Sequence, residues 1–138
     1  MRLPPPLSLF LLALLALGGC NRPSYDTPVQ AYQSFHRAVQ RGEQKAAYSA
    51  LSQPTQEALQ KRAQAVAQAS GGTVKAEPQS FFFANVPPPA DVTEVTLASE
   101  EGDMATISVV SSNGKSQVRM VRESSGWKVD LTQSLQQP

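Results

Sequence analysis

The sequence predicts an α+β domain in which N-terminal helices pack on a curled, four-stranded antiparallel meander sheet. Two observations predict it. Between residues 28 and 70, apolar residues recur at the spacing of one helix face, whereas from residue 91 onward they alternate with polar residues, as in half-buried strands. Short turns divide the alternating part into four runs, which favours antiparallel strands in sequence order. With 138 residues, the chain is long enough for one such domain and too short for two.

The N-terminal segment has the three parts of a secretory signal peptide. A positive charge at Arg2 precedes an apolar run over 7–17, and the small residues Gly18 and Gly19 follow it. The apolar run has about half of the roughly 20 residues that a membrane-spanning helix needs. The predicted division of the chain is a signal peptide at 1–19, an anchor and tether at 20–26, one domain at 27–131 and a flexible tail at 132–138.

A first helix is predicted to begin at Pro28 and to end before Gly42. Thr27 is a suitable N-cap, Pro28 fits the first helical position, and Gln30 completes a capping box with Thr27. Glycine is the usual residue just beyond a helix end. One apolar stripe follows helical spacing along this segment and consists of Val29, Tyr32, Phe35 or His36, and Val39.

Two further helices are predicted over 43–51 and 55–70. The second of these is rich in Ala, Gln, Glu, Lys and Arg, which favour helices, and Gly71 ends it. Its expected buried stripe consists of Leu59, Ala63 and Val66. A short helical turn is then predicted at Phe81, Phe82 and Phe83, whose rings would fill the space between the helices and the sheet.

Four strands are predicted from the alternating pattern, over 92–97, 105–109, 118–121 and 127–131. The middle hairpin is predicted to turn at Asn113-Gly114, because Asn and Gly tolerate the positive φ that a two-residue turn requires. Trp127, in the last strand, is expected to be buried between the sheet and the helices.

The four residues from Leu17 to Cys20 resemble the lipobox of bacterial lipoproteins: an aliphatic residue, two small ones and the only cysteine of the chain. The resemblance implies cleavage between Gly19 and Cys20, a diacylglyceryl group on the Cys20 sulfur, and acylation of the new amino group by a fatty acid such as palmitate. The membrane partner would then be held through covalent lipid. The alternative is ordinary secretory cleavage that leaves a free thiol.

The residue after the cysteine bears on which membrane is expected. In a sorting rule of some bacterial lipoproteins, Asp at this place retains the protein at the inner membrane. The residue here is Asn21. The resemblance therefore implies the cell envelope, and the periplasmic face of the outer membrane rather than the inner membrane.

The order of predicted elements resembles the nuclear-transport-factor-2-like superfamily, a cone-shaped, cystatin-like fold. The matching residues are the helix start at 28–32, the Gly42-Glu43 turn into a second helix, and the closing strand at 126–131. More closely, the chain resembles small, uncharacterised bacterial lipoproteins that carry such a domain behind a lipobox. These matching residues are structural, so the resemblance implies no catalytic residue.

Composition argues against several classes of function. The chain has 12 Lys and Arg against 11 Asp and Glu, and so lacks the basic excess of a nucleic-acid-binding protein. It has one cysteine and one histidine, His36, so no metal and no cofactor are expected. The acidic residues fall at turns or opposite the aliphatic residues of the strands, and none is expected to point inward. We therefore expect no catalytic residues and a protein that is not an enzyme.

Several functions remain open on the sequence alone. The domain would bind an envelope protein or a small ligand, or act as a spacer that supports envelope organisation. The alternative is an isomerase- or dehydratase-like enzyme, as some relatives of this fold are, with His36 and Tyr32 as an acid–base pair one helical turn apart. Residues that either form the core or line an apolar pocket for a small ligand are Tyr32, His36, Phe81, Phe82, Phe83 and Trp127.

Overall fold

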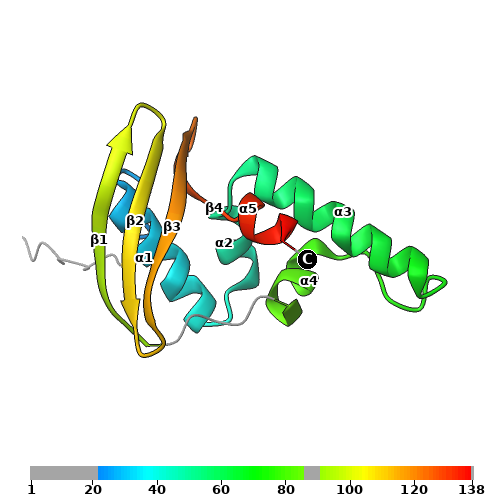
Figure 1. Cartoon of the computed structure of the whole chain (residues 1–138). Coiled ribbons are helices and arrows are strands. Elements are labelled where there is room, and N and C mark those ends of the chain that lie inside the picture. Colours follow the sequence, from blue (N-terminus) through cyan, green and yellow to red (C-terminus); the bar gives the residue numbers. More distant parts are fainter. Residues whose placement is uncertain (1–21, 86–90, 138) are drawn as a thin grey trace, which may run out of the picture.

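The computed structural model describes residues 22–85 and 91–137 and has an α+β architecture, as predicted (Figure 1). Helices precede a four-stranded antiparallel sheet with strand order β1-β2-β3-β4, and the sheet is not closed. The elements in chain order are α1 (Pro28–Gln40), α2 (Gln44–Ser49), α3 (Gln53–Ala69), α4 (Pro78–Asn85), β1 (Val92–Glu101), β2 (Met104–Ser111), β3 (Gly114–Glu123), β4 (Gly126–Asp130) and α5 (Thr132–Gln136).

Helix α1 begins and ends where the sequence predicts. The Thr27 side chain accepts a hydrogen bond from the Gln30 backbone N–H (3.2 Å), and Pro28 is the first helical residue. The predicted capping box forms only in part, because the Gln30 side chain accepts instead from the Ser24 hydroxyl (3.0 Å). The N-cap therefore follows from local sequence, and the second half of the box is replaced by a contact with the preceding segment.

Helix α3 begins two residues earlier than predicted, because Ser52 rather than a later residue caps it. The Ser52 hydroxyl accepts from the Thr55 backbone N–H (3.3 Å). Leu59 and Ala63 are buried as expected, but Val66 is 39% exposed, so the predicted inner stripe is wrong at its third position. Figure 1 shows the reason: α3 extends away from the sheet, so its C-terminal half does not reach the strands.

The middle hairpin turns one residue earlier than predicted. Ser111 pairs with Gly114, so the two-residue connection is Ser112 and Asn113. Among the described residues only glycines have positive φ, and Gly114 has a φ of 113°. The glycine is therefore needed at the first position of β3, where a side chain would strain the backbone.

One hydrophobic core lies between the sheet and the first four helices. Trp127 is 2% exposed, which confirms the predicted burial of this side chain. The strands contribute Ala105, Ile107, Val109, Met120, Trp127 and Val129. The helices and their connections contribute mainly Ala31, Tyr32, Phe35, Ala38, Ala47, Leu51, Leu59 and Phe82.

The two edges of the sheet differ. Residues 50–52 run beside β4 and cover its edge: the Ser52 N–H donates to the Val129 carbonyl (2.8 Å), and the Val129 N–H donates to the Ala50 carbonyl (2.9 Å). Strand β1 pairs with β2, and within 22–85 and 91–137 no strand pairs with its other side. The sheet therefore has one protected edge and one edge with unpaired backbone groups.

The segment before α1 is docked on the domain. The Ser24 N–H donates to Ser34 Oγ (3.0 Å), and the Ser34 hydroxyl donates to the Ser24 carbonyl (3.1 Å). The Trp127 N–H donates to the Tyr25 carbonyl (2.9 Å). A Cβ on Gly126 would lie 2.7 Å from this carbonyl oxygen, so the close approach requires glycine. Packing thus begins three residues before the predicted start of the domain, and the tether is correspondingly shorter.

The C-terminal segment also differs from the prediction. Where the sequence predicts a flexible tail, residues Thr132–Gln136 form helix α5. The Thr132 N–H donates to Asp130 Oδ1 (3.2 Å), which satisfies an otherwise unpaired donor of the first turn. Leu135 packs against the core, and α5 contacts α3.

Candidate functional site

The residues predicted to carry the lipid lie outside the described part of the chain. These are the cleavage residue Gly19, the lipidated Cys20 and the sorting residue Asn21. Among the described residues, none of the helices is both long and apolar enough to cross a membrane.

The six candidate pocket residues lie in different places. Three of them, Tyr32, Phe82 and Trp127, are buried in the core, with exposed fractions of 5%, 2% and 2%. Phe83 is half-buried and meets the Phe82 ring edge-on, with ring centroids 5.3 Å apart. The remaining two, Phe81 and His36, line separate surface hollows.

The hollow at Phe81 is a groove of about 360 Å³ between α3 and α4. Its apolar wall includes Val66 and Val74, which are 39% and 47% exposed. Charged and polar residues lie along it as well. The full lining is Ala63, Val66, Val74, Lys75, Glu77, Ser80, Phe81, Ala84 and Asn85.

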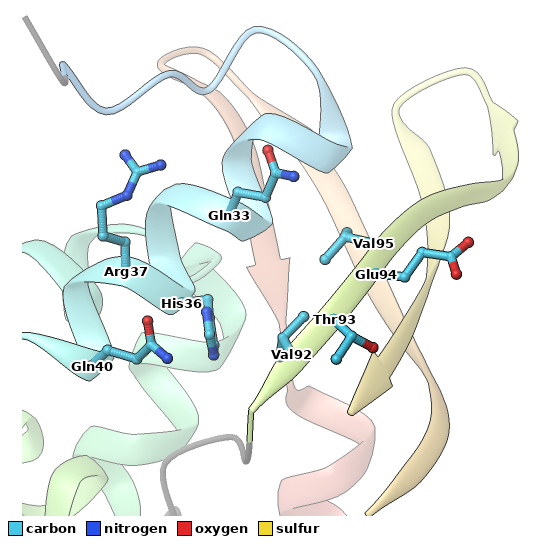
Figure 2. A pocket seen from close by; sticks show the side chains of 8 residues that line it. All are labelled: Gln33, His36, Arg37, Gln40, Val92, Thr93, Glu94 and Val95. Atoms are coloured by element: carbon cyan, nitrogen blue, oxygen red, sulfur yellow. The ribbon is translucent and has the colours of Figure 1, made fainter. Parts of the chain in front are cut away.

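The hollow at His36 is a cleft of about 320 Å³ between α1 and the free edge of β1 (Figure 2). We call it the α1–β1 cleft. Helix α1 contributes Gln33, His36, Arg37 and Gln40, and β1 contributes Val92, Thr93, Glu94 and Val95. Figure 2 shows the His36 ring pointing from α1 toward Val92, whereas the Glu94 carboxylate points away from α1. The cleft thus combines an imidazole with the backbone edge of a strand.

The His36 side chain is positioned by packing on its own helix. Its ring stacks on the Tyr32 ring, with centroids 6.2 Å apart and an interplanar angle of 14°. Desolvation by burial lowers the pKa of the His36 imidazole below its ordinary value of 6.5, which favours the neutral ring near pH 7. Its Nε2 atom is buried and has no hydrogen-bond partner among the described residues.

The contact of His36 with Tyr32 is a stacked one. The two ring planes are nearly parallel, and His36 Nε2 makes no hydrogen bond to the Tyr32 hydroxyl or to any other described group. The Tyr32 side chain itself is buried, and desolvation raises the pKa of its phenol above the ordinary value of 10.0. The geometry therefore supports His36 as a lone hydrogen-bonding group in the cleft more than as half of an acid–base pair with Tyr32.

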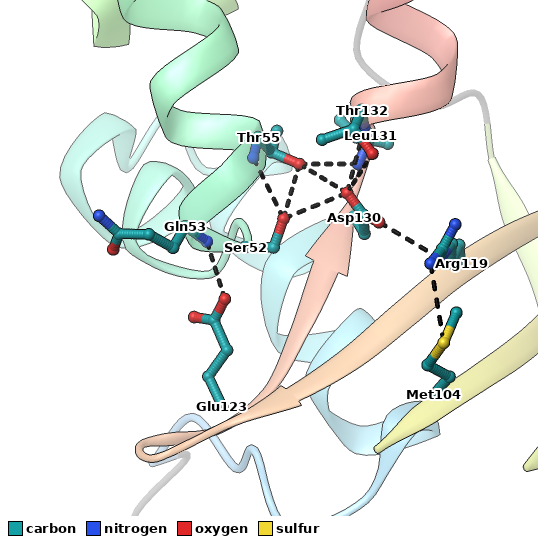
Figure 3. A network of polar contacts seen from close by, with 9 residues as sticks. All are labelled: Ser52, Gln53, Thr55, Met104, Arg119, Glu123, Asp130, Leu131 and Thr132. Atoms are coloured by element: carbon teal, nitrogen blue, oxygen red, sulfur yellow. Dashed lines mark hydrogen bonds and ion pairs between the residues drawn. The ribbon is translucent and has the colours of Figure 1, made fainter. Parts of the chain in front are cut away.

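A second polar cluster, which the sequence did not predict, surrounds Asp130 at the end of β4 (Figure 3). Its Oδ1 atom accepts from the hydroxyls of Ser52 (3.2 Å), Thr55 (3.1 Å) and Thr132 (2.8 Å). Its Oδ2 atom lies 3.4 Å from Arg119 Nε, an ion pair without hydrogen-bond geometry. Only 6% of the Asp130 side chain is exposed. The expectation that none of the acidic side chains points inward is therefore wrong for Asp130.

The pKa of Asp130 follows from this environment. Desolvation by burial would raise the pKa of the carboxyl, but hydrogen bonds from Thr132, Thr55 and Ser52 outweigh it. The net result is a pKa below the ordinary value of 3.8, so the group is ionised at neutral pH. The three hydroxyls lie at the starts of helices α3 and α5, so their hydrogen bonds to Asp130 fasten both helices to β4. This arrangement indicates a structural role. An Asp-x-Thr sequence just before a helix is a local signal that could have indicated the capping part of this cluster.

No match was found by a scan against protein-family models, a search of curated proteins or a search of solved structures. Within the described residues, no group of three or more His, Cys, Asp or Glu side chains lies close enough to hold a metal ion.

Proposed function

We propose that this chain is a lipid-anchored cell-envelope protein whose domain binds a partner without catalysing a reaction. The observation that carries the proposal is the α1–β1 cleft, a surface hollow beside a strand edge that pairs with no other strand in 22–85 and 91–137. It is lined by His36, whose Nε2 atom has no hydrogen-bond partner in that part of the chain. Such a cleft offers hydrogen-bonding groups and half-buried apolar side chains, the usual means of binding. We further propose that the domain is a cone-shaped member of the nuclear-transport-factor-2-like superfamily, which the order of helices before a meander sheet supports.

The docked N-terminal segment supports a domain held close to the lipid. Ser24, the first described residue that bonds to the domain, is four positions after Cys20. A fully extended chain spans at most about 3.6 Å per residue, so the domain surface would lie within about 14 Å of the anchor. A domain on so short a tether is suited to holding a partner at the membrane surface.

The packing around the candidate acid–base pair supports binding over catalysis. Tyr32 is enclosed in the core, with Phe35 beside it at a centroid distance of 6.0 Å. The only carboxylate among the cleft residues belongs to Glu94 and points away from α1 (Figure 2). A general acid–base mechanism needs the proton-transferring groups within reach of one substrate atom.

Replacing Cys20 by Ser tests the anchor. Without the thiol, no diacylglyceryl group can be attached, and we expect the variant to lose the membrane-anchored, processed form of the protein. Fractionation and mass spectrometry of the N-terminus should show acyl chains on Cys20 in the unaltered chain only. Several chains on one residue anchor firmly, because each buried methylene contributes about 0.8 kcal/mol. A Cys20→Ser chain that is still fully processed and membrane-bound would contradict the proposal.

Asn21→Asp tests the proposed outer-membrane location. If the sorting rule applies, the unaltered chain should fractionate with the outer membrane and the variant with the inner membrane. Asn21→Gln is the matched control and should leave the distribution unchanged, since it adds no charge. An unaltered chain found wholly in the inner membrane would show that the rule does not operate here, without bearing on the lipid anchor itself.

A further inference from the structure

We propose that the free edge of β1 and the α1–β1 cleft bind an extended peptide segment that alternates apolar and basic residues. The segment would add to the sheet as a fifth strand beside β1. This inference rests on the proposed binding function and names its partner class.

The backbone of β1 has the properties of an acceptor strand. It is 10 residues long, and along its free side alternate residues direct N–H and C=O groups away from β2. Register shifts interrupt its pairing between Val92 and Glu94 and again between Leu97 and Ser99. The regular stretch between them is Glu94 to Leu97. These shifts limit an added strand to a short, defined register, because bulges break the regular ladder of hydrogen bonds.

The side chains of this stretch specify the partner's pattern. Val95 and Leu97 pair with the buried residues Val109 and Ile107 and so lie on the core-facing side of the sheet. Leu97 is nevertheless 47% exposed, so part of this apolar side is unoccupied. Glu94 lies on the opposite face of the strand, as does Thr96. An added strand would therefore place apolar residues on the first face and basic residues on the second.

The charge of β1 favours a basic partner over a second copy of this chain. The strand contains Glu94, Glu100 and Glu101 and no Lys or Arg. None of these three carboxylates takes part in an ion pair within the described residues. Edge strands commonly carry lysine, which discourages self-pairing, whereas β1 carries only acidic charges. Two β1 strands side by side would bring like charges together, and a basic strand would neutralise them.

The cleft also contains a group that an added strand could satisfy. His36 Nε2 is buried without a partner among the described residues, and its ring points toward the start of β1 (Figure 2). A buried polar atom without a hydrogen bond is unfavourable. Because Nε2 is enclosed, a peptide group in the cleft would pair with it only after the imidazole turns toward the cleft, and that pairing would remove the cost.

A synthetic peptide of about seven residues, the length of an ordinary strand, tests the inference directly. The probe alternates valine and lysine, and the comparison peptide alternates valine and glutamate. Both carry a fluorophore and are titrated with the full chain in detergent micelles, and binding is followed by fluorescence anisotropy. Amide chemical shifts of the isotope-labelled chain locate the site. We expect the lysine peptide to bind with shifts concentrated in 92–97 and on α1 around His36, and the glutamate peptide to bind at least tenfold more weakly.

Charge reversal on β1 gives the decisive comparison. Glu94→Lys should weaken binding of the lysine peptide by about three- to tenfold, because it replaces a favourable cross-strand pair by a repulsive one. Glu57→Lys makes the same change on an exposed position of α3 and should leave the affinity unchanged. Equal effects of the two substitutions would overturn the inference, because the attraction would then depend on net charge alone.

Other outcomes would also overturn it. Equal binding of both peptides would contradict the basic partner class, and shifts confined to the α3–α4 groove would place the site elsewhere. Self-association of the chain that protects the β1 amides would identify a second copy as the occupant. Each of these results leaves the lipid anchor and a binding role intact. Failure of the proposed function would instead be seen in the fractionation of the Cys20→Ser chain.

Discussion

Replacing Trp127 by Ala is expected to lower the free energy of unfolding by about 3–5 kcal/mol, the range for removing a large aromatic side chain from a core. The indole is 2% exposed and belongs to the core formed by the sheet and the helices. Its loss would leave a cavity that neighbouring elements cannot readily fill, because β4 is bonded on both sides along its backbone. Urea unfolding followed by circular dichroism measures the change.

The same substitution would also remove a contact over the indole ring. The Arg122 guanidinium lies 5.2 Å from the ring centroid, a cation–π contact whose contribution is about 0.5–1 kcal/mol at an exposed site. The backbone bond from Trp127 to Tyr25 does not depend on the side chain and should persist. The expected effect is therefore one of packing.

Val66→Ala is the control for this prediction. It also shortens an apolar side chain, but Val66 is 39% exposed on α3, and we expect a change within about 0.5 kcal/mol. A Trp127→Ala chain that unfolds within about 1 kcal/mol of the unaltered chain would mean that the indole is not part of the stabilising core.

The elements that could be predicted from the sequence are those whose signals are local. The N-cap Thr27, the helix start at Pro28 and the alternation in 105–109 are properties of neighbouring residues, and the structure has the corresponding helix and strand. Burial of Trp127 was predictable for the same reason, since it follows the alternation of its strand.

The features that could not be predicted depend on residues distant in sequence. The Ser52 hydroxyl and the Asp130 carboxylate are 78 positions apart, and only the fold brings them together. Docking of Tyr25 on β4 likewise joins the two ends of the domain. The exposure of Val66 follows from the length of α3 relative to the core, which helical periodicity does not report.

The candidate site was predictable only in part. His36 was recognised because it is the only histidine of the chain. The predicted meander already places the first strand at one edge of the sheet, but it does not indicate that α1 lies beside that edge and brings His36 to it. The acidic character of β1 was visible in the sequence, but its meaning required the finding that residues 50–52 cover the opposite edge.

Replacing Asp130 by Ala is expected to lower the free energy of unfolding by about 2–3 kcal/mol, because hydrogen bonds to a charged group each contribute about 1.5–3 kcal/mol and some of the donors can find other partners. The Ser52 and Thr55 hydroxyls, 2.7 Å apart, can still bond to each other, and Arg119 is 38% exposed and can reach water. The Thr132 donors at the start of α5 lose their acceptor, so this helix should loosen first.

The lowered pKa of Asp130 makes the contribution of this side chain to the free energy of unfolding dependent on pH. A carboxyl whose pKa is lower in the folded than in the unfolded chain stabilises the fold at pH values above its ordinary pKa of 3.8. That stabilisation is lost as the pH falls through the lower pKa of the folded state. Asp130→Asn, which keeps one oxygen acceptor but cannot ionise, should therefore reduce the decline in stability between neutral pH and strongly acidic conditions.

Asp103→Asn is the matched control, and the comparison decides whether Asp130 holds the ends of three elements together. The Asp103 side chain is 75% exposed, and its pair with Arg122 at 3.0 Å is a surface ion pair, which contributes about 0–1 kcal/mol. Urea unfolding of both variants at neutral and acidic pH should show a large, pH-dependent loss for Asp130→Asn alone. Equal losses would mean that the carboxylate contributes no more than a surface charge, even though Ser52, Thr55 and Thr132 all donate to it. In that case, hydrogen exchange in α5 and at the start of α3 should also be unchanged in Asp130→Asn. If the cluster does hold these helices, exchange should be faster in both segments of the variant.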